Sequence, residues 1–320
     1  MAKKSSVLSL IKEPNWRFVW IGLALLLAYQ ILIWGGFISG NDGINQWESN
    51  VIKAERYIYS HNRKQGEILL VGSSMANRLQ PEYLGERTFN LAMQGANSLT
   101  GLEIALQAKT KPDLIMVEVN ETIGLGVDRD LMANLYQPLL YYLRLYFPMF
   151  RQEYRPVSVL VSSLRSSSKQ SQPQLNAEQQ DKLQIKDERL RKKIIQDVVE
   201  SRSKQLTPEM EANLRQQATL LKQQIQQLQQ AGVKTLLFNI PGEPEVQNTV
   251  RQKQTRAILQ EVFPADTFNW LAEPPRQNWV TSDGIHLIYS NAKEYAIFIK
   301  SQLMQDPLLL ESSQGTEDKL

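Results

Sequence analysis

Near its start, the chain carries a long segment without a charged residue. This segment, FVWIGLALLLAYQILIWGGFISGN, covers the 24 positions 18–41. As an α-helix it would be about 36 Å long, enough to cross a bilayer hydrocarbon core of about 30 Å. Trp16 and Trp20 at one end and Trp34 at the other match the aromatic residues found at membrane interfaces. We therefore predict an uncleaved, single-pass transmembrane anchor over residues 18–40.

The charges that flank this segment predict its orientation. Residues 1–17 are basic, with Lys3, Lys4, Lys12 and Arg17 against Glu13. The positive-inside rule places such a flank in the cytoplasm, so the chain after about Gly40 would lie outside it. A cleaved signal peptide and a helix buried in a soluble core are the alternatives. The apolar run exceeds the about 7–15 residues of a signal peptide and no clear small-x-small cleavage site follows it, which favours the anchor.

Composition argues against several classes of function. Of the 320 residues, 42% are hydrophobic and 22% are charged, which is ordinary for a globular protein. The net charge is +3 and residues 1–17 alone supply it, so the rest of the chain has no basic field to attract nucleic acid. There is no cysteine, and His61 and His286 are the only histidines. We therefore expect no disulfide and no thiolate or histidine-rich metal centre.

Four short apolar segments indicate the strands of a sheet. They are EILLVGSS (67–74), TFNLAMQG (88–95), DLIMVEVNE (113–121) and KTLLFNIPGEP (234–244). Uninterrupted apolar strands separated by helical segments are typical of a parallel sheet covered on both faces. Residues 45–62 and 97–110 have the spacing of amphipathic helices, and we expect His61 on the surface near the end of the first. The pattern predicts an α/β fold with a doubly wound parallel sheet, whose functional groups gather at the carboxyl ends of the strands.

The middle of the chain has a different character. Residues 131–161 are rich in aromatic side chains, namely Tyr136, Tyr141, Tyr142, Tyr146, Phe147 and Phe150. We expect them to pack beneath the segment that follows, with glycan binding or a position at the membrane surface as alternatives. The Ser/Gln-rich stretch 162–180 is typical of a mobile linker. Residues 211–232 have the apolar stripe of a surface helix that ends at Gly232.

These segments divide the chain into six parts. The basic N-terminus (1–17) and the anchor (18–40) precede the first part of the α/β domain (41–156). A linker and helical insertion (157–230) separates it from the last part of the domain (231–306), and a polar, flexible tail (307–320) follows.

Candidate chemistry centres on His286, three residues after Asp283 in SDGIHLIYSNAKEYA (282–296). A histidine general base needs a hydroxyl to deprotonate and a carboxylate to orient its ring, and Asp283 could supply the carboxylate. Ser74 ends the first strand segment in Gly-Ser-Ser and would begin a helix, so its own N–H could face a developing oxyanion. Gly95 after the second strand and Asn120 after the third are candidates for two further donors.

Taken in order, these four stretches resemble the SGNH hydrolases, also called the GDSL esterase/lipase superfamily, over residues 67–121 and 233–300. The resemblance implies a three-layer α/β sandwich, in which Ser74 is the nucleophile and Asp283 and His286 complete a triad. It also implies a mechanism that requires no metal and no organic cofactor. It also implies that Ser74, Gly95 and Asn120 form the oxyanion hole.

Two motifs depart from the common pattern of that superfamily. Gly-Ser-Ser stands where Gly-Asp-Ser is common, and Glu-x-Asn-Glu stands where Gly-x-Asn-Asp is usual. The first block is more similar to a membrane-anchored branch that modifies the cell envelope, such as D-alanine transfer proteins and alginate O-acetyltransferase-like proteins.

The resemblance implies a serine esterase or O-acyltransferase, anchored in the bacterial cytoplasmic membrane, that acts on acyl groups of an envelope glycan outside the cytoplasm. Transfer to a sugar would need a membrane partner that delivers the acyl donor. A non-catalytic scaffold or glycan-binding protein is the alternative, with the Gln-rich helix 211–232 mediating assembly. Within the site, Ser74 or Asp283 could merely cap helices, or Ser73 could be the nucleophile.

Overall fold

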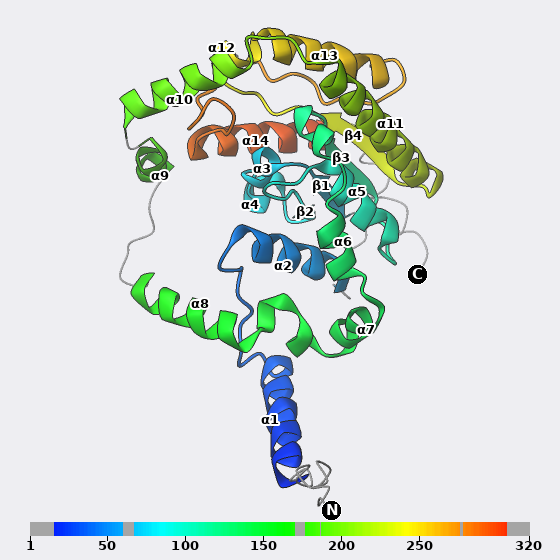
Figure 1. Cartoon of the computed structure of the whole chain (residues 1–320), viewed down its shortest axis with the longest axis vertical. Helices are drawn as coiled ribbons and strands as arrows, with labels where there is room; N and C mark the ends of the chain where they lie inside the picture. Colours follow the sequence, from blue (N-terminus) through cyan, green and yellow to red (C-terminus); the bar gives the residue numbers. More distant parts are fainter. Residues whose placement is uncertain (1–15, 60–66, 170–176, 186, 276–277, 306–320) are drawn as a thin grey trace, which may run out of the picture.

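The computed structural model describes residues 16–59, 67–169, 177–185, 187–275 and 278–305. The predictions for His61, for most of the basic segment 1–17 and for the tail 307–320 fall outside these residues. Figure 1 shows an α/β domain from which helix α1 (Trp16–Trp34) projects.

The four predicted strands are present and form one parallel sheet. They are β1 (Ile68–Val71), β2 (Thr88–Asn90), β3 (Leu114–Glu118) and β4 (Lys234–Phe238), in the spatial order β2-β1-β3-β4. Ile68 pairs with Thr88 on one side and with Leu114 on the other. The next strand in the chain, β2, pairs with one edge of β1, and the following strand, β3, pairs with the other edge. The segments that follow β2 and β3 therefore lie on either side of the carboxyl end of β1.

Helices cover both faces of the sheet. Leu69 and Val71 pack into one core with α2 (Gln46–Tyr59), α5 (Ser98–Gln107), α6 (Arg129–Leu135), α11 (Pro208–Gln230) and α13 (Val250–Val262). Leu70 points to the opposite face, where the second core includes α3 (Ser74–Asn77), α4 (Pro81–Leu84) and α14 (Tyr289–Gln305). This alternation explains why the strands read as continuous apolar runs.

Further helices lie between and beyond these elements. They are η2 (Glu121–Leu125), α7 (Pro138–Tyr146), η3 (Pro148–Phe150), η4 (Gln152–Tyr154), α8 (Pro156–Lys169), α9 (Ala177–Gln184), α10 (Glu188–Ser201) and α12 (Pro244–Gln247).

The predicted linker over residues 162–180 is wrong for the part that the structure describes. Helix α8 continues to Lys169, and α9 begins at Ala177. Pro156 occupies the start of α8, where proline is tolerated, and the apolar residues Val157, Leu160 and Leu164 follow at helical spacing. That spacing outweighs the linker-like composition.

Helix α11 is part of the α/β domain, although the sequence division assigned its residues to the insertion. It packs against α5, η2 and α13, and buries Leu214, Leu221, Ile225 and Leu228 in the core that also contains Leu69. The apolar stripe of this helix was predicted correctly, but the sequence did not indicate which elements it packs against. The inserted part is therefore shorter than residues 157–230.

Helix α1 is long and apolar enough to cross a membrane, as predicted, and among the described residues it is the one helix of this kind. It ends at Trp34 and not at residue 40. Gly35 and Gly36 follow, and Gly36 has φ +73°, the left-handed conformation that commonly ends a helix. Within α1 the buried side chains are those of Gln30 and Ile33.

Candidate active site

The structure brings Ser74, His286 and Asp283 into a hydrogen-bonded row, although Ser74 lies 212 residues from His286. Ser74 Oγ is 2.7 Å from His286 Nε2, and His286 Nδ1 is 2.7 Å from Asp283 Oδ2. An ionised carboxylate can only accept, so Nδ1 carries the hydrogen and Nε2 of the neutral ring accepts the Ser74 proton. This is the geometry in which a histidine can activate a serine hydroxyl as a nucleophile.

The turn after β1 determines how Ser74 is presented. Ser73, and not Ser74, is the residue that caps α3, because Ser73 Oγ accepts a hydrogen bond from Met75 N–H at 3.2 Å. Ser74 is the first helical residue, and its N–H makes no hydrogen bond to the described residues. The alternative in which Ser74 serves as the cap is therefore wrong. Its hydroxyl reaches His286 and its N–H is free to bind an anion.

Asp283 is held by its own loop and does not cap α14. Its Oδ1 accepts hydrogen bonds from His286 N–H at 2.8 Å and Ile285 N–H at 3.1 Å. Burial raises the pKa of Asp283, but the His286 ring and these N–H groups more than reverse this effect and lower it to about 2. The first N–H groups of α14, from Tyr289 and Ser290, bond instead to Gln184 and Asp181 of α9.

Gly95 lies in the loop after β2, beside the end of β1. It has φ +70°, so its backbone conformation favours glycine, and a Cβ there would lie 2.5 Å from Nε2 at the end of the flexible Gln46 side chain. The preceding residue is fixed by Asn50 of α2, which accepts from Gln94 N–H and donates to its carbonyl. The Gly95 N–H makes no hydrogen bond to the described residues.

Asn120 lies on the other side of β1, after β3. Its Oδ1 accepts a hydrogen bond from Thr122 N–H at 2.8 Å and caps η2. Its Nδ2 is buried and makes no hydrogen bond to the described residues, although the amide lies near the Glu118 carboxylate and lowers the pKa of that group. Buried amide donors are rarely left without a partner, so Nδ2 is available to a ligand at this edge of the sheet.

Glu118, which the sequence analysis did not single out, lies beneath the Ser73–Ser74 turn. It is 1% exposed, and Oε2 accepts a hydrogen bond from Ser73 N–H at 2.5 Å. Burial raises the pKa of Glu118 to about 7, and the Ser73 N–H and the nearby Asn120 amide offset part of the rise. An acidic residue inside an apolar strand was the available signal in the sequence.

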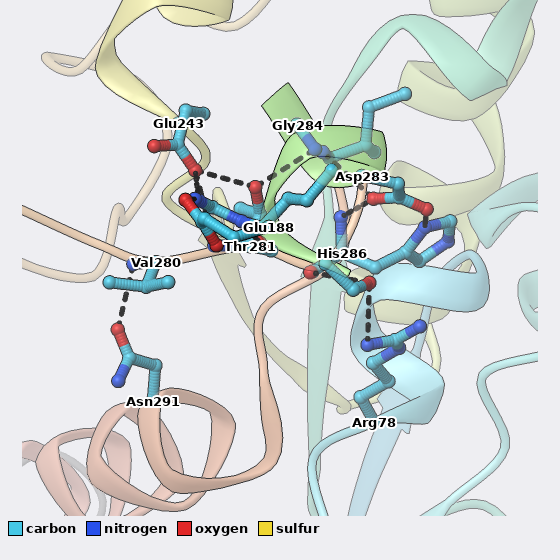
Figure 2. A network of polar contacts seen from close by, with 12 residues as sticks. Arg78, Glu188, Glu243, Val280, Thr281, Asp283, Gly284, His286 and Asn291 are labelled. Atoms are coloured by element: carbon cyan, nitrogen blue, oxygen red, sulfur yellow. Dashed lines mark hydrogen bonds and ion pairs between the residues drawn. The ribbon is translucent and has the colours of Figure 1, made fainter. Parts of the chain in front are cut away.

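A second polar network holds the loop that carries Asp283 and His286 (Figure 2). Glu243 Oε2 accepts from Thr281 Oγ1 at 2.6 Å and forms an ion pair with Arg191 at 2.8 Å. Arg191 Nε also donates to the Thr281 carbonyl at 2.6 Å. On the opposite side of the loop, Arg78 donates to the Leu287 carbonyl at 2.7 Å. Helix α10 of the inserted part thus contacts the loop directly.

Helix α2 supports the site from the side of α1. Lys53 Nζ donates to the Ala92 carbonyl at 2.7 Å and to Asn77 Oδ1, which joins the loop after β2 to the end of α3. Burial lowers the pKa of Lys53 to about 8. No local sequence pattern would have linked this lysine to the site.

A cavity of about 760 Å³ adjoins these residues. Its wall includes Met75, Asn120 and Ile285, each close in sequence to a candidate site residue, and extends to Arg202 and Trp270. Its volume lies within the range of small-molecule sites, so there is room for a substrate group beside Asn120.

No family model and no curated protein matches the chain.

Proposed function

We propose that the protein is a membrane-anchored serine esterase or O-acyltransferase of the SGNH type, with Ser74, His286 and Asp283 as its triad. The observation that carries this proposal is the continuous row of two 2.7 Å contacts from Ser74 Oγ through His286 to Asp283. The low pKa of Asp283 keeps its carboxylate charged and able to stabilise the imidazolium that forms.

The chemical steps follow from these contacts. Ser74 Oγ attacks the carbonyl carbon of an ester while His286 Nε2 takes its proton. The same proton then passes from His286 to the departing alkoxide, which leaves an acyl group on Ser74. Water or a sugar hydroxyl, deprotonated in turn by His286, attacks the acyl-serine. The bond between the acyl carbon and Ser74 Oγ then breaks, and His286 returns the proton to Ser74 Oγ. The negative charge on the carbonyl oxygen is bound by Ser74 N–H, Gly95 N–H and Asn120 Nδ2.

Helix α1 and the cavity support the proposed envelope location and glycan substrate. A helix able to span a membrane favours a substrate held near the membrane surface. The cavity beside Asn120 offers space for an acceptor sugar, and polar groups such as Arg202 and Gln252 line part of it. Acyl transfer further requires a membrane partner that supplies the acyl group.

The test is formation of an acetyl-serine intermediate by the full chain in detergent. Wild type should release a burst of p-nitrophenol from p-nitrophenyl acetate, stoichiometric with protein, and mass spectrometry should find one acetyl group on the peptide that contains Ser74. Ser74→Ala and His286→Ala should lose both signals. His61→Ala is the matched control, since it removes the other histidine of the chain. If folded wild type forms no acetyl-serine, the catalytic proposal fails and a glycan-binding scaffold is favoured.

A further inference from the structure

Helices α7 and α8 expose an apolar surface beside the end of α1. We call α7, η3, η4 and α8 together the collar. Its most exposed apolar side chains are Leu139 (71% exposed), Tyr142 (61%), Tyr146 (65%), Val157 (72%), Leu160 (62%) and Leu164 (65%). In Figure 1, α7 and α8 extend to either side of the domain-proximal end of α1. The expected packing of the aromatic stretch beneath the insertion is therefore wrong for Tyr142 and Tyr146, which lie on the surface.

The collar is joined directly to α1. Gln30 is 1% exposed, and its Oε1 accepts a hydrogen bond from Met149 N–H of η3 at 3.1 Å. One residue earlier, Tyr29 Oη donates to the Tyr154 carbonyl at 2.6 Å. A polar side chain inside an apolar helix is costly in lipid unless it is paired, and η3 supplies a partner for Gln30 Oε1, whereas the buried Nε2 makes no hydrogen bond to the described residues.

The length of α1 determines the depth of the collar. Its 19 residues give about 28 Å of helix, close to the about 30 Å of a hydrocarbon core. A bilayer crossed by α1 therefore extends to about Trp34, and the contacts at Tyr29 and Gln30 fall within the outer part of the span. Segments that touch α1 at this level lie at the bilayer surface.

We propose that the collar rests in the outer interface of the same bilayer and inserts its exposed apolar side chains among the lipid headgroups. Tyrosine, which occupies positions 142 and 146, is enriched at membrane interfaces. Residues 138–169 contain five basic residues (Arg144, Arg151, Arg155, Arg165 and Lys169) and one acidic residue, Glu153. Arg144 is paired with buried Glu55 and Glu153 with Arg56, and the remaining basic residues leave an excess of positive charge that agrees with an anionic lipid surface. A bilayer also covers apolar residues that would otherwise face water.

The collar is rigidly attached to the domain that carries the site. Arg144 of α7 pairs with Glu55 of α2 at 3.2 Å, and both side chains are buried. Glu55 also accepts a hydrogen bond from Gln152 N–H at 2.6 Å. Since α2 carries Asn50 and Lys53, which hold the loop of Gly95, membrane contact by the collar fixes the height and tilt of the site above the lipid.

This inference rests on α1 spanning a bilayer, which belongs to the proposed function, but it is independent of the acyl-serine chemistry. The chain has no cysteine, so a single introduced cysteine can carry one nitroxide label without other changes. We would label Tyr142→Cys and Leu160→Cys in the collar of the full chain, reconstituted in nanodiscs of zwitterionic and anionic lipid. Leu25→Cys in α1 and Val250→Cys in α13 are the reference positions, and all four residues are exposed.

The measurement is relaxation of the label by oxygen, which concentrates in lipid, and by a water-soluble nickel chelate. Labels at 25, 142 and 160 should relax several-fold more with oxygen than with the chelate, and the label at 250 should show the reverse. If 142 and 160 behave like 250 while 25 stays in lipid, the collar lies in water and the inference fails while the anchor stands. A label at 25 that behaves like 250 overturns both.

Two other occupants of the collar give different signals. A second copy of the chain would shield 142 and 160 from both reagents and broaden their spectra by spin–spin coupling, which contradicts a lipid contact. A protein partner is absent from the nanodiscs, so a collar reserved for such a partner would behave as though in water. Burst activity of each labelled protein, measured in parallel, shows whether a failure concerns the chemistry or the membrane contact.

Discussion

The carboxylate of Glu118 supports the turn that presents the candidate nucleophile, since its Oε2 accepts a hydrogen bond from Ser73 N–H at 2.5 Å. A Cβ at Gly72 would lie 2.5 Å from the same oxygen, so glycine is required for the carboxylate to approach the turn so closely. The end of β3 thus positions the residue that follows β1, and the site depends on a contact between neighbouring strands as well as on the triad.

Glu118→Gln should change the pH dependence of stability. The pKa of Glu118 is raised from 4.5 to about 7, so between these pH values the unfolded chain releases a proton that the folded chain keeps. Below about pH 4.5, Glu118 is protonated in both the folded and the unfolded state. As the pH rises to about 7, the free energy of unfolding of wild type should fall by up to about 3 kcal/mol relative to that of Glu118→Gln. Urea unfolding of both proteins in detergent from about pH 4 to about pH 8 measures this difference. A constant difference over that range would contradict the raised pKa.

Ser73→Ala should distinguish the role of Ser73 as a helix cap from the proposed role of Ser74 as the nucleophile. It removes the Oγ that accepts from Met75 N–H, and loss of such a helix cap costs about 1 kcal/mol. The Ser73 N–H, which bonds to Glu118, is kept. We therefore expect a lower melting temperature with an acetyl group still found on Ser74 by mass spectrometry. Loss of the acetyl adduct in folded Ser73→Ala, with its retention in Ser74→Ala, would assign the nucleophile to Ser73.

Arg191→Ala should destabilise the loop that carries Asp283 and His286, although Arg191 itself lies in α10. It removes the hydrogen bond to the Thr281 carbonyl and leaves Glu243, 18% exposed, without its ion pair. We expect a loss of about 1–3 kcal/mol in stability and a lower acylation rate, because the unpaired carboxylate repels the loop carbonyls around it. Arg189→Ala is the matched control, since Arg189 is exposed on the same helix.

A double variant distinguishes this positioning role from a general loss of stability. Glu243→Gln should restore part of the stability lost in Arg191→Ala, because it removes the unpaired charge while an amide oxygen can still accept from Thr281. Stopped-flow acylation rates of wild type, the two single variants and the double variant give the coupling energy between Arg191 and Glu243. Rates equal to wild type in Arg191→Ala would show that α10 does not position the triad loop.

The sequence predicted the strands and the residues at their ends because both depend on local patterns. Uninterrupted apolar runs such as Leu69–Val71 occur where a strand is buried on both faces, and small or polar residues after them mark one edge of the sheet. The row from Ser74 to His286 could be anticipated because Ser74 ends a predicted strand, because Asp283 lies three residues before His286, and because the segments together resemble the SGNH hydrolases.

Contacts between distant segments could not be predicted in this way. The apolar stripe of α11 shows that one face is buried, but it does not show that the face packs on α5. Arg191 and Thr281 are 90 residues apart, and neither lies in a distinctive motif. The composition of residues 162–180 favoured a linker because serine and glutamine dominate it, whereas the apolar spacing in α8 extends across its boundary.

Asn120→Asp should remove the proposed oxyanion donor, at some cost in stability because the new carboxylate lies near buried Glu118. The two side chains have nearly the same shape, and a carboxylate oxygen can still accept from Thr122 N–H, so the cap of η2 is preserved. The carboxylate cannot donate to the oxyanion and repels its charge. We expect the acylation rate to fall by about 10²–10³-fold, the effect typical of losing one such donor.

Thr122→Val controls for this substitution, because it removes the Thr122 hydroxyl contact to Asn120 Oδ1 but keeps the Nδ2 donor. Acylation by Thr122→Val should stay close to that of wild type, and thermal unfolding should show that Asn120→Asp remains folded at the temperature of the assay. If Asn120→Asp acylates as fast as wild type, its buried Nδ2 does not bind the developing charge. Ser74 N–H and Gly95 N–H would then have to stabilise the oxyanion alone, and the unpartnered amide would need another ligand.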